Sequence, residues 1–384
     1  MNRIYLDHAA TTPVTDKVLA SMLPFFSECW GNPSGIYGTG REARKAVEKA
    51  RRQAAAALGS EPREIIFTSG GSESDNMAIK GAAYALKETG NHIITTAIEH
   101  PAVLNTCRWL ETQGFRITYL PPDGKGRIDP ESVRRSIRND TILISVMTAN
   151  NEIGTLEPIS EIGAAAREKG ILFHTDAVQA VGAVPVDVNR MNTDLLSLSA
   201  HKFGGPKGIG ALYIRKGSKV EKLIHGGEQE RGMRAGTENL PAIVGLGTAI
   251  EEAAENLAAC TEYTSRLRDR LISGIIGTIP DSKLNGPAED RLPGNCHVSF
   301  ERIDGEALLL RLDLAGIAAS SGSACTSGSR ESSHVLKAIG LTETEAKGSL
   351  RLTVGKENTA EEIEETIRVI RGIVDELRSL YRNS

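Results

Sequence analysis

The chain has 384 residues, of which 40% are hydrophobic and 24% are charged, and its formal net charge is −4. This length suits about two domains, and the composition is that of an ordinary globular protein. The weak charge and the aromatic content of only 4% argue against direct nucleic-acid binding and against a basic membrane-binding patch.

The amino-terminal stretch MNRIYLDHAATTPVTDK shows neither the apolar core of a signal peptide nor the pattern of a transit peptide. No apolar run is long enough for a membrane span. The five cysteines form no CxxC pair, and their odd number argues against a disulfide framework or a zinc site. We therefore expect a reducing, cytoplasmic setting and no bound metal.

From about residue 63, short apolar runs alternate with stretches of helical periodicity. The apolar runs are EIIFTSGG, HIITTAIEH, RITYLPPD, TILISVMTANN, ILFHTDAV, TDLLSLSAHKF and GIGALYIR. They are continuous rather than alternating, as expected for strands that are buried on both faces. The pattern predicts an α/β domain over residues 14–260, with a mainly parallel sheet and functional loops at the strand ends.

The alternation of short apolar runs and helical stretches ends after about residue 236. Residues 238–275 read as one long helical stretch with room for a single break. Beyond it come a strand in NCHVSFERI, a helix in GEALLLRLDLAGI, a Ser- and Gly-rich loop, a strand in GSLRLTVG and a final helix that opens with a capping box, Thr359 to Glu362. We predict that residues 1–13 and 261–384 form a smaller α+β domain.

Two strand ends carry residues suited to covalent cofactor chemistry. Lys202 ends the stretch LLSLSAHK, just after a buried strand, where lost solvation lowers the pKa of a lysine and frees its amine to form a Schiff base. Asp176 ends the run ILFHTD, where a carboxylate needs a partner, and a pyridinium nitrogen would serve. An ordinary surface lysine and a capping aspartate are the alternatives.

Two further strand ends complete the pattern. In FTSGGSESDN, Gly70 and Gly71 let the backbone approach an anion at a helix N-terminus, although a tight turn with a capped helix would look the same. His100 ends the next run before a proline and could stack on a ring or move protons, or simply be a satisfied buried histidine. Together with Lys202 and Asp176, these residues are the parts of a site for pyridoxal 5′-phosphate (PLP).

At this point the chain resembles the cysteine desulfurases of the NifS/IscS type, within the class V aminotransferase group of fold-type I PLP enzymes. The resemblance spans nearly the whole chain and rests on motifs in family order: IYLDHAATTP, GNPS, FTSGGSESDN, EHPAV, NNEIGT, HTDAVQAVG, HKFGGPKGIGALY, ERGMRAGTEN, SSGSACTSGS and GSLRLTVG. It implies a large PLP-binding domain with a mainly parallel, seven-stranded sheet like that of aspartate aminotransferase, and a small domain that carries the cysteine loop.

The resemblance also implies the cofactor contacts. Lys202 would bind PLP covalently, His100 would stack on its ring, Asp176 would face the ring nitrogen and Gln179 the ring hydroxyl. The phosphate would be held by Gly71, Ser72, Ser199 and His201. Thr237 would reach the phosphate of a second subunit's cofactor, which implies a homodimer.

For the reaction, the resemblance implies that Asn151 and Arg351 bind the carboxylate of L-cysteine and that Cys325 accepts its sulfur as a persulfide, leaving L-alanine. A loop rich in Gly and Ser suits a cysteine that must reach both the substrate and an acceptor protein. That acceptor would be an iron–sulfur scaffold or a tRNA-thiolating enzyme. A tolerated surface thiol, a selenocysteine lyase and a sulfur-delivery scaffold with incidental catalysis are the alternatives.

Overall fold

A computed structural model describes residues 3–321 and 332–382 of the chain, so the predictions for Cys325 lie outside the described residues. Its main sheet has seven strands. Their order is β2 (Ile65–Thr68), β8 (Gly210–Ile214), β7 (Leu195–Ser199), β6 (Leu172–Asp176), β5 (Thr141–Ser145), β3 (His92–Thr96) and β4 (Arg116–Leu120). Only β8 runs antiparallel to its neighbours. The predicted fold class is therefore confirmed.

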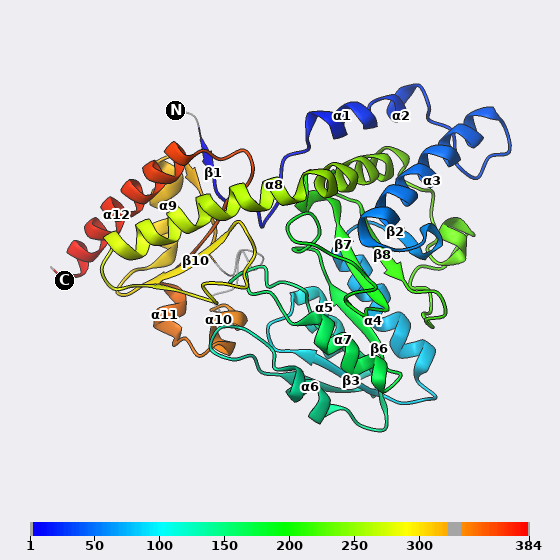
Figure 1. The fold of residues 1–384 in the computed structure, drawn as a ribbon, viewed down its shortest axis with the longest axis horizontal. Coiled ribbons are helices and arrows are strands. Elements are labelled where there is room, and N and C mark those ends of the chain that lie inside the picture. Colours follow the sequence, from blue (N-terminus) through cyan, green and yellow to red (C-terminus); the bar gives the residue numbers. More distant parts are fainter. Residues whose placement is uncertain (1–2, 322–331, 383–384) are drawn as a thin grey trace.

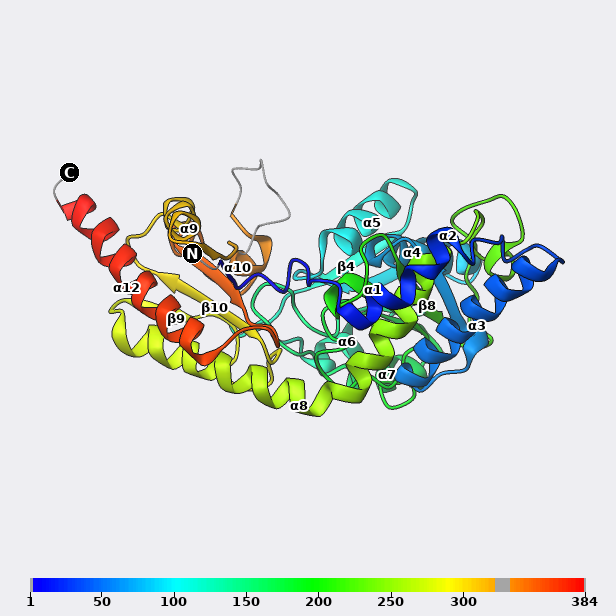
Figure 2. The ribbon, with the colours of Figure 1, turned by 90° about the horizontal axis from the view of Figure 1, so that it is seen from above.

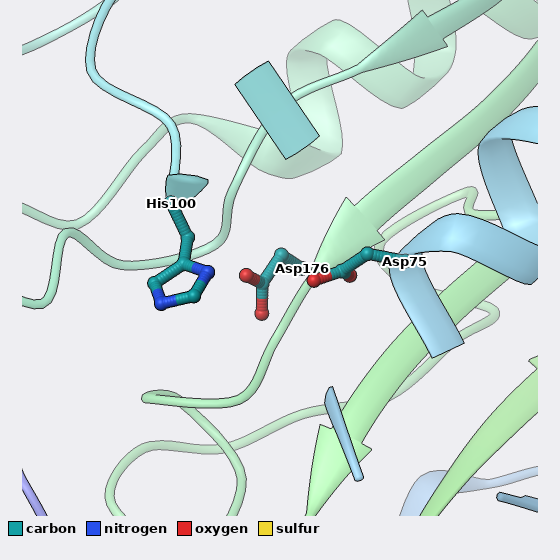
Figure 3. A group of neighbouring side chains, drawn as sticks. All are labelled: Asp75, His100 and Asp176. Carbon is teal, nitrogen blue, oxygen red and sulfur yellow. The ribbon is translucent and has the colours of Figure 1, made fainter. Parts of the chain in front are cut away.

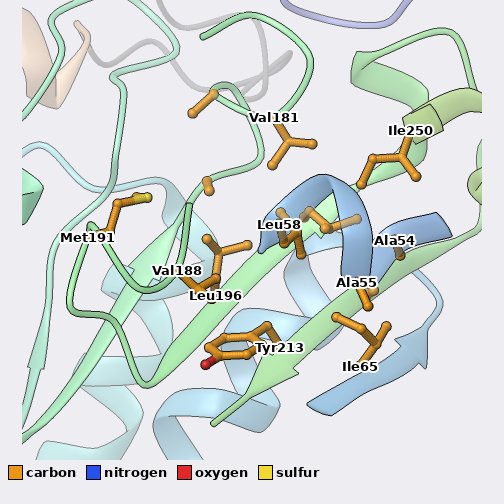
Figure 4. Close-up of a cluster of buried hydrophobic side chains, with 14 of the residues drawn as sticks. Ala54, Ala55, Leu58, Ile65, Val181, Val188, Met191, Leu196, Tyr213 and Ile250 are labelled. Atoms are coloured by element: carbon orange, nitrogen blue, oxygen red, sulfur yellow. The ribbon is translucent and has the colours of Figure 1, made fainter. Parts of the chain in front are cut away.

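Helices cover both faces of this sheet, which explains why its central strands are buried along their whole length. One face packs against α4 (Gly71–Leu86) and α5 (Pro101–Thr112). The other face packs against α3 (Gly38–Leu58), α6 (Pro130–Ser136), α7 (Ile159–Glu168) and the first part of α8 (Leu240–Thr278). Figure 4 shows part of this second layer, where Leu58 and Ile65 meet side chains from β7 and β8.

Helix α8 is a single helix of 39 residues, so the break that the sequence allowed does not occur. It packs closely along α3, because a Cβ on Gly247 would lie only 2.6 Å from the Cα of Ala50. The short helices α1 (Asp16–Met22) and α2 (Pro24–Ser27) lie nearby, with Met22 packed on the same part of α8. Figures 1 and 2 show α8 running from beside the large sheet to a second group of strands.

That second group is an antiparallel sheet of β12 (Ser349–Thr353), β10 (Asn295–Phe300) and β9 (Ser282–Leu284). Its hydrophobic cluster takes side chains from the last part of α8 and from two further helices. The remaining elements are β1 (Ile4–Tyr5), α9 (Gly305–Leu314), β11 (Ile317–Ala318), α10 (His334–Ala338), α11 (Glu343–Lys347) and α12 (Ala360–Arg382). The amide of Glu362 donates to Thr359 Oγ1 over 3.2 Å and the amide of Thr359 to the Glu362 carboxylate over 3.1 Å, so the predicted capping box is confirmed.

The two hydrophobic clusters meet α8 at different places. Side chains up to Ile250 belong to the large cluster and side chains from Leu267 onward to the small one. The amino-terminal strand β1 pairs with β11 beside the small sheet. The division at residue 260, with residues 1–13 assigned to the small domain, stays a prediction that this separation of the cores supports. None of the helices within residues 3–321 and 332–382 combines the length and the apolarity needed to span a bilayer.

Candidate active site

The candidate site lies at the carboxyl ends of four strands that share one edge of the main sheet. Strand β2 leads into the glycine turn before α4, β3 leads to His100 at the start of α5, β6 ends at Asp176, and β7 leads to Lys202. Because β2, β3, β6 and β7 all run in the same direction, their carboxyl ends gather the side chains that the sequence singled out.

A cavity of about 450 Å³ lies at the N-terminus of α4. All four residues predicted to hold a phosphate line it, namely Gly71, Ser72, Ser199 and His201. A Cβ on Gly71 would lie 2.7 Å from Val178 Cγ2, so only glycine lets the helix start this close to the loop after β6. We call this cavity the cradle; its phosphate role stays a prediction.

The cradle presents a neutral histidine. Burial, followed by the positive charges of Lys202 and Lys207, lowers the pKa of His201 to about 4. Its Nδ1 lies 3.2 Å from Thr11 Oγ1. At neutral pH, His201 can therefore contact an anion only as a hydrogen-bonding group, while Lys207 supplies positive charge at the cavity wall.

Beside the cradle, His100, Asp176 and Asp75 lie together, with Asp176 between the other two (Figure 3). Their ligand atoms all lie within 4.8 Å of one another. Burial raises the pKa of Asp176, although His100 and Lys202 oppose the shift. The pKa of Asp75 is raised well above its usual range by complete burial and by the charge of Asp176.

His100 is neutral as well, since burial lowers its pKa. Its Nδ1 accepts a hydrogen bond from the amide of Ala102 over 3.1 Å, which leaves the proton of the neutral ring on Nε2. Asp176 accepts from the amide of Val178 over 2.9 Å, so part of the capping alternative is also true. The buried carboxyl group of Asp176, beside the neutral imidazole of His100, could form an ion pair with a protonated pyridine nitrogen. A metal cation could bind the same carboxylate instead.

Lys202 lies where β7 ends, in contact with the amino-terminal segment. Its Nζ donates to the carbonyl oxygens of Ala9 and Ala10 over 2.5 and 2.8 Å. Gln179 Nε2 also donates to the Ala9 oxygen, over 3.0 Å. Lys202 and Gln179 line a second cavity, of about 370 Å³, which reaches toward the small sheet. The lysine thus lies within the electrostatic reach of both His100 and Asp176.

The two residues predicted to bind a substrate carboxylate lie side by side. Arg351 Nη1 donates to the Asn151 carbonyl oxygen over 2.9 Å, and Nη2 donates to Asp7 Oδ1 over 2.9 Å. The guanidinium is buried, with 4% of the side chain exposed. Each terminal nitrogen keeps a second N–H, and the buried Nε has no hydrogen-bond partner among the described residues, so the guanidinium retains donors for a carboxylate.

Asp7, Ala9 and Ala10 were missed as site residues, although the motif IYLDHAATTP contains them. Nothing local in that motif shows that it would lie against Lys202 and Arg351. The small side chains of Ala9 and Ala10 let their backbone carbonyls approach Lys202 closely, but the sequence gives no sign of which residue these carbonyls contact.

Thr237 stands apart from the residues above. It is exposed, follows the 3₁₀ turn Gln229–Gly232, and lines neither cavity. Its predicted contact with the cofactor phosphate of a second subunit, which the sequence resemblance implied, stays a prediction.

Comparison with known proteins gives concordant results. The family model for aminotransferase class V matches residues 4–366. A cysteine desulfurase IscS from Methanosarcina thermophila is 55% identical, over 98% of this chain and 93% of its own. A solved NifS-like protein superposes with a TM-score of 0.92 at 40% identity, covering 97% of this chain and 99% of its own. A structure described as SspA in complex with cysteine has a TM-score of 0.83 at 42% identity, covering 93% and 100%.

Proposed function

This chain belongs to the class V aminotransferase family and, within it, to the cysteine desulfurases, and from that premise we propose which residues perform the reaction. The resemblance predicted from the motifs is thereby confirmed. L-Cysteine and an enzyme thiol give L-alanine and an enzyme persulfide. The Cβ–S bond of the substrate breaks and an S–S bond forms, while the carbon skeleton keeps the bonding electron pair and gains one proton.

We propose that the cofactor is PLP, which when bound draws electron density from the substrate Cα. Lys202 would hold it covalently, Asp176 would pair with its ring nitrogen, and the cradle would take its phosphate. The support is the fit of the residues present. A buried, destabilised carboxylate lies beside a neutral imidazole, and a glycine-lined helix N-terminus opens next to them.

The residues of the chain have separable tasks toward L-cysteine. Arg351 and Asn151 would orient the substrate carboxylate, because they lie together at the edge of the site. Lys202 would take the proton from Cα and later return one to the carbon skeleton. His100 Nε2, which carries the proton of the neutral ring, would stay available to the cofactor ring and the substrate.

Cys325 would accept the sulfur as a thiolate and carry it as a persulfide to an acceptor protein. We propose a homodimer in which Thr237 of each chain completes the phosphate site of the other. The acceptor would be an iron–sulfur scaffold or a tRNA-thiolating enzyme. The single observation that carries the proposal is that Lys202, His100, Asp176 and the cradle converge on one edge of the sheet in a member of this family.

The test is Cys325→Ser in the full chain, with Cys29→Ser as the matched control, since Cys29 lies half-buried and lines neither cavity. Serine keeps the size of cysteine but cannot accept sulfur. We expect the Cys325 variant to bind PLP and L-cysteine normally, yet to form no persulfide and almost no alanine. The Cys29 variant should work like the wild type.

Alanine released per bound cofactor is measured for L-cysteine and L-selenocysteine in parallel. Full activity of the Cys325 variant on L-cysteine would end the proposed sulfur transfer. Loss of activity on L-cysteine but not on L-selenocysteine would indicate that selenium leaves without thiolate attack and that selenocysteine cleavage is a second activity.

A further inference from the structure

Glu73 places a negative charge in the cavity that is predicted to bind the cofactor phosphate. It lies in the first turn of α4 and is the one acidic side chain among the described residues that line the cradle. A free carboxylate there would repel a phosphate dianion and would compete for the same helix N-terminus. The chain must therefore hold this charge away from the anion or neutralise it.

Arg234 does both. Its Nε donates to Glu73 Oε1 over 2.9 Å and its Nη2 donates to Oε2 over 3.3 Å. The amide of Ser69 donates to Oε2 over 2.9 Å and holds the carboxylate at the outer edge of the glycine turn. Both carboxylate oxygens are thus engaged, and the pair is largely shielded, with 12% of the Glu73 side chain exposed.

We propose that Arg234 is a positioning residue for the cofactor phosphate, which neutralises Glu73 and so leaves the cradle with donors and the positive charge of Lys207. The inference rests on the PLP site proposed above. Arg234 does not itself line the cradle.

The electrostatics agree with this geometry. Burial by itself would raise the pKa of Glu73, but the hydrogen bonds from Arg234 and Ser69 outweigh it and the pKa lies below its usual value. Glu73 is therefore ionised at neutral pH, and its charge has to be balanced for an anion to bind nearby. If Arg234 were absent, the negative charge of Glu73 would offset the positive charge of Lys207 within the same cavity.

Arg234 also precedes Thr237 by three residues, so an alternative is that the ion pair only anchors the segment that carries Thr237. Neutralisation of Glu73 and anchoring of the Thr237 segment predict different results when the charges of both Glu73 and Arg234 are removed. If neutralisation matters, deleting Glu73 makes Arg234 dispensable. If anchoring matters, deleting both partners leaves the segment as loose as deleting one.

The experiment is a double-mutant cycle of Glu73→Gln and Arg234→Gln in the full chain, in which each apoprotein is titrated with PLP and with pyridoxal. Pyridoxal lacks the phosphate but binds the same lysine. Arg234→Gln should weaken PLP binding about 10- to 100-fold, as expected when a partly buried charge loses its partner, and should leave pyridoxal binding unchanged. The double variant should recover most of the PLP affinity, and Arg234→Lys should retain it.

Arg134→Gln is the matched control, because it removes an exposed ion pair with Glu168 between α6 and α7, and neither residue lines the cradle. Normal PLP binding by Arg234→Gln overturns the inference, as does equal weakening for pyridoxal or a double variant that stays weak. If Arg234→Gln fails to fold, Glu73→Gln decides: affinity at or above the wild-type value supports the inference, and a loss overturns it. Wild-type protein that binds no PLP would instead refute the cofactor proposal.

Discussion

Replacing Arg351 by leucine tests the substrate contact most directly. The guanidinium is almost fully buried and its two terminal nitrogens bond to Asp7 and to the Asn151 carbonyl. Leucine keeps an apolar stem of similar width but removes the charge and all donors. A charge-assisted hydrogen bond contributes about 1.5–3 kcal/mol, so losing one such bond to the substrate carboxylate should weaken capture about 10- to 100-fold.

The assay is the initial rate of alanine formation at varied L-cysteine, with KM and kcat determined separately. We expect KM to rise in Arg351→Leu while PLP absorbs as in the wild type. Arg351→Lys keeps the charge but loses the planar fork of the guanidinium, so its KM should lie between those of the wild type and Arg351→Leu.

Asp7→Asn supplies the structural control for this prediction. Its amide oxygen can still accept from Arg351 Nη2, so the guanidinium stays in place while the negative charge that competes for it disappears. KM for this variant should equal the wild-type value or fall below it. A normal KM in Arg351→Leu would refute the assignment, because another group must then bind the carboxylate. Because leucine leaves Asp7 without its ion-pair partner, Arg351→Leu could also lower the stability of the protein. A thermal melt distinguishes such a loss of stability from weaker substrate binding.

Three further predictions concern the cofactor and the fold. Lys202→Ala should lose alanine formation and the absorbance near ~420 nm of PLP bound to a lysine; normal turnover would exclude this lysine. Thr237→Ala should bind PLP more weakly, as measured by cofactor loss on dilution, with an unchanged melting temperature; equal retention would remove support for the inter-subunit contact. Burial raises the pKa of Glu99 from 4.5 to about 8, so the stability it contributes is complete below pH 4.5 and is lost as the pH rises to about 8. Glu99→Gln should therefore gain stability relative to the wild type across that range in melts at increasing pH, and a constant difference would contradict the shift.

Much of the fold could be predicted because the signals that determine it are local. Continuous apolar runs such as Thr141–Ser145 are buried along their whole length, which is what a strand covered on both faces requires. The capping box between Thr359 and Glu362 involves residues three apart, so the sequence alone identifies it. The break allowed in residues 238–275 was the exception, since the packing of α8 on α3 and on the small sheet favours one continuous helix.

The main residues of the candidate site could also be predicted from the sequence. Lys202, Asp176 and His100 each follow a recognisable strand, and parallel strands bring their carboxyl ends to one edge whatever the exact packing. Their roles were then assigned by resemblance, because the chemistry of a lysine at a strand end is not distinctive by itself.

The pairing of buried charges could not be predicted from the sequence. Asp7 and Arg351 are 344 residues apart, and Glu73 and Arg234 are 161 apart. No periodicity or turn signal links such positions, because their proximity depends on how whole elements pack rather than on local backbone preference. Local sequence signals are therefore enough to predict the main sheet, most of its helices and the strand ends that carry the chemistry. The long-range pairing of buried charges, which controls how the site treats a carboxylate and a phosphate, came from the fold.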